Sequence, residues 1–209
     1  MFGDGTLSFQ EFAMREPLPL ATLQEAILEF LRGRKDAALF GAQAVNAYVG
    51  QPRMTQDVDI LTLNATDLGK ELCSFLKSRF HIAVRIREVA KGMGFRIYQV
   101  QKPKNRHLAD LRPVESLPPT QRIADVLVVT PAELIAGKVR VYHLRRGKPK
   151  SFTDLRDLAV LFLAFPKLKQ EKGEAYDRLV VEGADTSLLK TWQQVVNQEI
   201  VPEEEDDEY

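Results

Sequence analysis

Along the first 129 residues, short apolar runs alternate with stretches in which apolar residues recur every three or four positions. The runs predict buried strands, and the longer spacing predicts amphipathic helices. We expect helices to begin near Thr22, where Glu25 has capping-box spacing, near Gln43, and at Asn64. The expected strands span residues 37–40, 58–62, 82–89, 95–100, 108–114 and 126–129, the last as a short edge strand.

The pattern becomes wholly helical after residue 129. Thr130, Pro131 and Glu133 combine an N-cap, a proline at the first helical position and a capping-box glutamate, which predicts a helix to about Leu144. Ser151 begins the next helix. Two more helices are expected at 176–181 and 188–200. The chain therefore divides into an α/β core (1–129), a helical cap (130–202) and an acidic disordered tail (203–209).

Charge is unevenly distributed along the chain. The formal net charge is zero, from 29 basic and 29 acidic side chains. Six of the acids lie within residues 203–208, so the rest of the chain carries a net charge of +6. The simplest interpretation of the tail is a solvated end. Because the body is basic, the neutral total does not exclude a phosphate-bearing partner.

Other features narrow the class of protein. A single cysteine, Cys73, excludes a disulfide framework, and its apolar neighbours indicate a buried thiol. His81, His107 and His143 lack the spacing of metal ligands. The longest strongly apolar run, 158–165, is shorter than the about 20 residues of a membrane span. With no signal-peptide pattern at the start, we expect a soluble, cytoplasmic protein with no membrane partner.

Candidate chemistry gathers upstream of residue 60. Asp57 and Asp59 are two positions apart on an expected strand, so their carboxylates project from one face. Such hard oxygen ligands suit Mg²⁺, which also bridges substrate phosphates. Gly41, at a strand-to-helix turn, lets backbone N–H groups approach a phosphate. Two solvated aspartates beside an ordinary turn are the simpler interpretation, but the basic Arg53 between the two motifs favours a nucleotide site.

The segment 39–60 resembles the active-site signature of the DNA polymerase β-like nucleotidyltransferase superfamily, and more narrowly that of the AbiEii/AbiGii-type toxin nucleotidyltransferases. Those proteins carry a Gly-Gly or Gly-Ser turn, a helix ending in glycine, and then Arg-x-Ser/Thr-x-Asp-x-Asp. The matching residues are Gly41, Gly50, Arg53, Thr55, Asp57 and Asp59, and Ala42 occupies the second position of the turn. The resemblance implies an α+β fold, in which a nucleotidyltransferase-type mixed sheet with flanking helices precedes a C-terminal helical subdomain.

The same resemblance implies a set of site residues. It makes Asp57, Asp59 and Asp110 the catalytic carboxylates that bind Mg²⁺, with Asp125 as second choice for the third position. It places Lys138 on the triphosphate. The implied nucleotide-binding residues are Gly41, Ala42, Arg53, Thr55, Lys138 and Arg145.

Two acids follow a basic run in the expected cap. The segment 138–150 holds six basic residues and no acid, which is typical of a solvated turn but could also hold a triphosphate or an RNA backbone. Asp154 and Asp157 are expected to stabilise a helix N-terminus and to pair with these bases. A direct catalytic role for Asp154 is the alternative.

The implied activity is Mg²⁺-dependent transfer of NMP from an NTP to a hydroxyl of an RNA, such as a tRNA, or of a protein. The resemblance further implies a toxin with a cognate antitoxin as partner. Ala42 stands where the family has a second glycine or a serine, which removes one side-chain contact to phosphate. This departure keeps open a catalytically degenerate nucleotide- or RNA-binding module. A structural interaction protein is the third interpretation.

Overall fold

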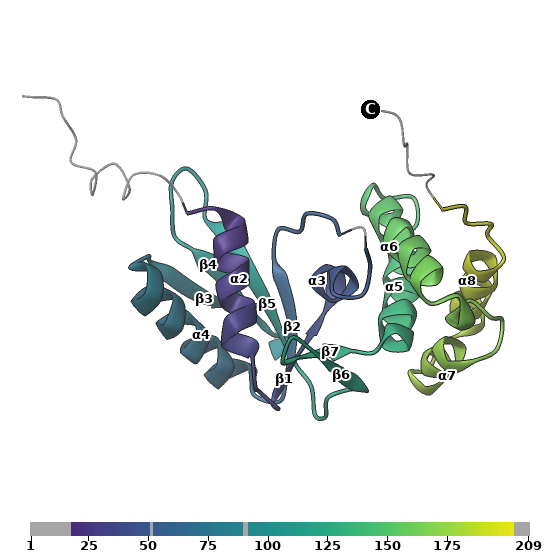
Figure 1. Ribbon diagram of the computed structural model, residues 1–209, viewed down its shortest axis with the longest axis horizontal. Helices are drawn as coiled ribbons and strands as arrows, with labels where there is room; N and C mark the ends of the chain where they lie inside the picture. The colour runs from purple at the N-terminus through teal and green to yellow at the C-terminus, as the bar shows by residue number, and fades with distance from the viewer. Residues whose placement is uncertain (1–17, 51, 90–91, 203–209) are drawn as a thin grey trace, which may run out of the picture.

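The computed structural model describes residues 18–50, 52–89 and 92–202, so the expected acidic tail lies outside the described residues. A mixed seven-stranded sheet with the order β3-β4-β5-β2-β1-β7-β6 forms the centre (Figure 1). The strands are β1 (Ala37–Phe40), β2 (Val58–Thr62), β3 (Val84–Glu88), β4 (Phe95–Gln99), β5 (Arg106–Pro113), β6 (Thr120–Ile123) and β7 (Val126–Val129). The pairs β2–β5 and β1–β7 are parallel, and the other pairs are antiparallel. The expected α+β class with a mixed sheet is confirmed.

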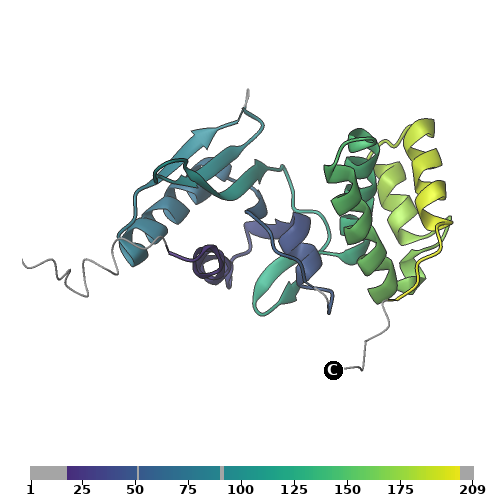
Figure 2. The ribbon, with the colours of Figure 1, turned by 90° about the horizontal axis from the view of Figure 1, so that it is seen from above.

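Helices flank this sheet and continue beyond it. They are α2 (Leu20–Leu31), α3 (Gly41–Asn46), α4 (Ala65–Phe80), α5 (Pro131–Arg145), α6 (Lys150–Ala164), α7 (Glu174–Val181) and α8 (Thr186–Val196), with a 3-10 turn at Pro166–Leu168. Helices α2 and α4 lie beside the β3–β5 side of the sheet, while α5 to α8 gather beyond α3 (Figures 1 and 2). In the described ranges, no helix combines the length and apolar character needed to cross a membrane.

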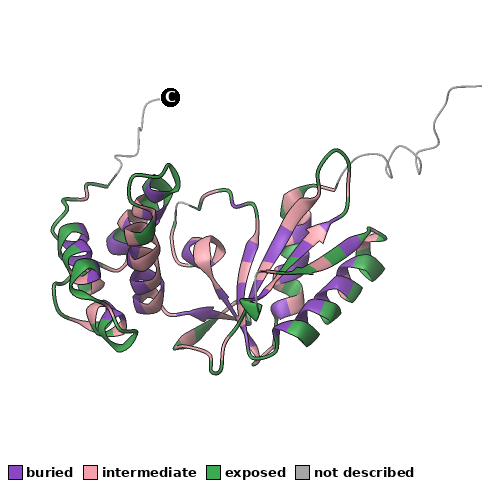
Figure 3. Ribbon diagram, turned by 180° about the vertical axis from the view of Figure 1, so that it is seen from behind, coloured by how far each residue is buried: buried purple, intermediate pink, exposed green. Residues whose placement is uncertain are grey.

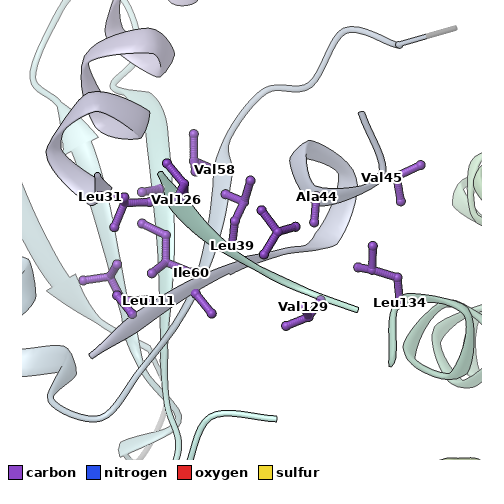
Figure 4. Packing of buried hydrophobic residues seen from close by; sticks show 14 of the residues in the cluster. Leu31, Leu39, Ala44, Val45, Val58, Ile60, Leu111, Val126, Val129 and Leu134 are labelled. Atoms are coloured by element: carbon purple, nitrogen blue, oxygen red, sulfur yellow. The ribbon is translucent and has the colours of Figure 1, made fainter. Parts of the chain in front are cut away.

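The two faces of the sheet differ in polarity. In β2, Val58 and Ile60 are buried, while Asp59 between them is partly exposed. Buried residues of β2 and β5, among them Ile60 and Leu111, belong to one core with the end of α2 (Figures 3 and 4). This alternation sends apolar side chains toward the helices and leaves Asp59 on the other face.

A second part of the same core joins the sheet to the C-terminal helices. Val45 of α3 and Leu134 of α5 are both buried and lie between the two helices (Figure 4). Helix α5 starts immediately after β7, with Pro131 at its first position as expected. Because β7 pairs with β1, and β1 leads directly into α3, the strand that carries α5 is next to the strand that carries α3.

Local capping agrees with the sequence in one helix and differs in others. Asn64 caps α4 by accepting a hydrogen bond from the Asp67 N–H at 3.1 Å, as the pattern indicates. The expected capping box at Thr22 is wrong, because α2 already begins at Leu20, which packs against the core. The Thr130 side chain makes no capping hydrogen bond to α5.

The edge of the sheet also differs from expectation. The strand at 126–129, expected at an edge, lies between β1 and β6. The strand at that edge is β6, whose residues include polar Gln121 and charged Arg122 and show no apolar run that would indicate a strand. It is stabilised by antiparallel pairing with β7. Pairing, and not hydrophobic pattern, creates this strand.

Candidate active site

Three aspartates lie on one face where β2 and β5 pair. Asp57 immediately precedes β2, and Asp59 lies within it, so the two share a face. Asp110 of β5 is directly opposite Asp59 in the parallel register. The structure thus brings together the three carboxylates expected from the sequence, from two strands separated by α4, β3 and β4.

The turn after β1 approaches one of these carboxylates closely. Gly41 has a φ of +70°, in the left-handed region, and a Cβ built on it would lie 2.0 Å from the Asp59 Oδ2. Only glycine therefore fits both the backbone conformation and the space. Gly41 and Ala42 begin α3, so the backbone of this turn lies beside the carboxylates.

His107 joins this cluster, although its spacing in the sequence is not that of a metal ligand. Its Nδ1 lies 3.0 Å from the Asp57 Oδ2, and its Nε2 lies 3.2 Å from the Asp110 Oδ1. Burial by itself lowers the pKa of His107, but the hydrogen bonds and negative charges of Asp110 and Asp57 outweigh it and raise the pKa to about 10. The side chain is therefore a cation that bridges two carboxylates at neutral pH.

The negative charges of the cluster act on one another. Burial, followed by the charges of Asp57 and Asp110, raises the pKa of Asp59 to about 6, while the charges of Arg112 and Lys138 oppose the rise. Crowded carboxylates of this kind favour a bound cation. Ligand atoms of Asp57, His107 and Asp110 all lie within 4.8 Å of one another. The carboxylate oxygens of this group therefore fit a divalent metal such as Mg²⁺, while the His107 ring nitrogens contact two of the carboxylates.

Three expected nucleotide-binding cations lie on the side of the cap helices. Arg53, in the loop between α3 and β2, donates to both oxygens of Asp157 in α6, at 2.7 and 2.9 Å. Lys138 of α5 donates to the same carboxylate at 2.6 Å. Arg145 donates to Asp154 at 3.1 Å. Asp154 and Asp157 thus pair with the bases as expected, but within α6, beyond its first residues.

Asp157 is the centre of this network. Its side chain is fully buried, whereas those of Arg53 and Lys138 keep 24% and 12% of their exposure. Burial alone raises the pKa of Asp157, but the hydrogen bonds from Arg53 and Lys138 hold it below the usual range. Because the charge of Lys138 also acts on Asp59, the network lies within electrostatic reach of the carboxylate cluster. We name Arg53, Lys138, Asp154 and Asp157 the cap network.

Thr55, expected as a nucleotide-binding residue, lies in the same loop as Arg53. Thr55 is buried, and its hydroxyl accepts hydrogen bonds from Gln43 at 2.7 Å and Gln24 at 3.2 Å. Asn46 holds the same loop by donating to the Arg53 carbonyl at 2.8 Å. These bonds fix the path of the loop that carries Arg53.

Not every expected residue joins the site. Asp125 lies in the turn before β7, at the end of the sheet opposite to Asp59, and pairs with Arg122 at 3.1 Å. The basic run is divided as well: Arg140 pairs with Glu182 at 2.7 Å, away from the cap network. Of this run, Lys138 belongs to the cap network and Arg145 contacts it through Asp154.

Comparison with known proteins gives a family. The family model described as "Nucleotidyl transferase AbiEii toxin, Type IV TA system" matches residues 23–205. No curated protein matches the sequence.

Several solved structures have a similar fold. The polyadenylate synthase of Megavirus has a TM-score of 0.58 at 15% identity over 79% of this chain, and the chain spans 39% of that protein. JHP933 from Helicobacter pylori has a TM-score of 0.51 at 15% identity, with 91% of this chain and 90% of that one covered. The antibiotic-resistance factor ANT(2″)-Ia has a TM-score of 0.51 at 13% identity, with 84% and 95% covered. At these identities the likeness concerns the fold.

Gly41→Ala tests the close approach of the turn to Asp59. The left-handed backbone and the contact with the Asp59 Oδ2 should together lower the free energy of unfolding by about 2 kcal/mol or more. Urea denaturation measures the change. Gly50→Ala is the matched control, since nothing lies within 4 Å of an added Cβ there. Equal stability of the two variants would contradict the close approach.

Asp157→Asn tests the cap network. Removing a fully buried carboxylate leaves Arg53 and Lys138 poorly compensated, so the free energy of unfolding at pH 7 should fall by about 3–5 kcal/mol. Since the pKa of Asp157 is lowered in the fold, its contribution is present above the pKa of the unfolded chain, near 4, and is lost as pH falls.

The Asp157→Asn variant should therefore lose less stability than the wild type between pH 5 and pH 2, as measured by urea denaturation across that range. Glu199→Gln, at an exposed position, is the control and should leave the profile unchanged. If the stability of Asp157→Asn falls with pH as that of the wild type does, the Asp157 carboxylate does not make the proposed contribution to stability.

Proposed function

The chain belongs to the AbiEii family of nucleotidyltransferase toxins, and from this we propose that it transfers NMP from an NTP to a hydroxyl of an RNA or protein acceptor and releases pyrophosphate. The observation that carries the proposal is the cluster of Asp57, Asp59 and Asp110 beside the Gly41 turn, with cations on its cap side. Phosphoryl transfer needs mainly such positioning and charge neutralisation.

The carboxylate cluster is suited to hold Mg²⁺. Asp57, Asp59 and Asp110 would be its protein ligands, because they share one face. Burial and, after it, the charges of Asp57 and Asp110 raise the pKa of Asp59, and a bound cation would offset both effects. Bound Mg²⁺ supplies neutralisation of the phosphate charge and activation of the attacking hydroxyl. His107 holds Asp57 and Asp110 in place by hydrogen bonds to both.

Cations of the cap side are suited to the triphosphate. The Lys138 ammonium is a compact charge and the Arg53 guanidinium a planar group with several donors, and both lie within electrostatic reach of the carboxylates. Arg145 is the most exposed of the three cations, at 41%. Asp157 fixes the directions of the Arg53 and Lys138 side chains, so their donors are oriented before a nucleotide arrives. The backbone of Gly41 and Ala42 completes the phosphate side of the site.

Asp110 is suited to orient the acceptor hydroxyl. Its Oδ1 accepts hydrogen bonds from Arg96 at 2.9 Å and is 3.2 Å from the His107 Nε2. Its Oδ2 is the oxygen that can accept a hydrogen bond from the incoming hydroxyl. Membership of the family also supports a toxin that acts with a cognate antitoxin, in the cytoplasm.

A second candidate function rests on Ala42 and on the cap network. Ala42 supplies no hydroxyl to a phosphate, and Asp154 and Asp157 already neutralise the cations that a triphosphate would need. Both features favour a module that binds a nucleotide without turnover. Isothermal titration with each NTP, with and without Mg²⁺, together with a pyrophosphate-release assay, separates the two functions: binding without release under any acceptor indicates the module.

Asp57→Asn and Asp59→Asn test the proposed transfer. Each removes a carboxylate that would hold the metal, so transfer of label from α-³²P NTP to total RNA or to lysate protein should fall at least about 100-fold, equal to about 3 kcal/mol of transition-state stabilisation. Scintillation counting of the RNA and protein fractions measures it.

Asp125→Asn is the matched control, because it removes the same charge at the far end of the sheet. It should keep wild-type transfer. Transfer that survives Asp57→Asn, or that Asp125→Asn abolishes, contradicts the assignment of the site.

A further inference from the structure

A cavity lies on the side of the carboxylate cluster away from the cap. Its volume is about 250 Å³, and Arg87, Glu88, Val89, Arg96 and Tyr98 line it. Four of these residues lie in β3 and β4, and Val89 directly follows β3, so the cavity belongs to the outer part of the sheet. None of them is among the residues assigned to the metal or the triphosphate.

Strand register connects this cavity to the carboxylates. Arg87 of β3 lies opposite Arg96 of β4, and Arg96 lies opposite Asp110 of β5. Directly opposed residues share a face, so this row runs without interruption to Asp59 of β2. Side-chain contacts confirm the continuity, because the Arg96 Nε donates to the Asp110 Oδ1 at 2.9 Å.

The aromatic residue of the cavity also touches the cluster. The ring of Tyr98 lies 5.1 Å from the ring of His107, centroid to centroid, and His107 contacts both Asp57 and Asp110. A group held against Tyr98 is therefore one side chain away from the carboxylates. Arg87 and Arg96 are both exposed, so their guanidinium groups are accessible.

The position suits the acceptor. Arg53, Lys138 and Arg145, the cations proposed for the triphosphate, lie on the cap side, whereas the cavity lies on the β4 side of Asp110. In phosphoryl transfer the attacking and leaving oxygens lie roughly in line, on opposite sides of the phosphorus. An acceptor in the cavity would approach from the side opposite to the pyrophosphate.

We propose that the cavity is the acceptor subsite and that it binds the terminal nucleotide of a single-stranded RNA, with the terminal hydroxyl directed to Asp110. This inference rests on the proposed function and identifies its acceptor. Two guanidinium groups match the phosphates of the strand, and Tyr98 offers a ring on which a base can stack. Paired arginines beside an aromatic ring fit a nucleic acid better than a protein acceptor, because a protein hydroxyl brings neither a phosphate for the arginines nor a base for the ring.

Direct binding tests the subsite without any need for turnover. Fluorescence anisotropy with a 5′-labelled single-stranded RNA of about ten nucleotides gives the Kd. Arg87→Ala and Tyr98→Ala should each raise this Kd about tenfold, and Arg87→Ala should lower the slope of log K against log salt by about 0.7. Tyr98→Phe keeps the ring and should bind as the wild type does. Arg32→Ala, at the exposed end of α2, is the charge-matched control and should change nothing.

Position along the RNA gives a second readout. An RNA with 4-thiouridine as its last nucleotide should cross-link under ultraviolet light to a peptide of β3 or β4, whereas the same probe at the first nucleotide should not. Unchanged Kd in both Arg87→Ala and Tyr98→Ala, or cross-links that fall only on the cap helices, would overturn the proposal.

Turnover then separates this inference from the proposed function. Relative to the wild type, Arg87→Ala should raise the acceptor KM about tenfold and leave the KM for NTP unchanged. If the wild type transfers no label but the variants still bind RNA more weakly, the proposed function is rejected and the cavity remains an RNA-binding site. Label transferred to protein and not to RNA would keep the transfer and overturn the RNA subsite.

Discussion

Mutual repulsion among Asp57, Asp59 and Asp110 is the constraint around which the structure is arranged. Burial and, after it, this repulsion raise the pKa of Asp59 to about 6. The protein compensates with four cations: His107 lies between two of the acids, Arg96 pairs with Asp110, and Arg112 and Lys138 act on Asp59 at longer range. Clustered carboxylates lower the stability of the folded protein, but they favour the binding of a metal ion. This is a common conflict between stability and function.

The cap network extends that compensation across the molecule. Apolar contact between α3 and α5, at Val45 and Leu134, brings the C-terminal helices against the sheet. Packing of this kind is not directional, whereas the two hydrogen bonds from Arg53 to Asp157 fix one geometry. Asp157 thereby ties the loop before β2, which leads into Asp57, to both α5 and α6. The positions of the carboxylates and of the cap cations are therefore coupled.

Sequence reasoning reached the parts of the site that depend on local spacing. Asp57 and Asp59 share a face because the strand period is two, and Gly41 has the conformation that its place at a turn indicates. His107 was missed because its partners are set by register: Tyr98 pairs with His107 and Ile97 with Ala109, and the irregularity between them turns His107 to the same face as Asp110. The sequence His-Leu-Ala-Asp carried this signal only through its three-residue spacing. Strand β6 was missed because pairing alone stabilises it. The contact between Asp157 and Arg53 could not be predicted from local spacing, because the two residues are more than 100 positions apart in the sequence.

The arrangement of charge also divides the open face of the site into two sides. On the cap side, the guanidinium of Arg53 and the ammonium of Lys138 are already engaged by buried acids, so they are oriented but partly neutralised. On the β4 side, Arg87 and Arg96 are exposed, and of these two only Arg96 forms an ion pair within the part of the chain that the structure describes. A small, highly charged triphosphate can compete for engaged donors because its charge is concentrated. A strand with one charge per phosphate gains more from donors that stay accessible. The different state of the cations on each side therefore follows from the different charge density of the two ligands that a nucleotidyltransferase must hold at once.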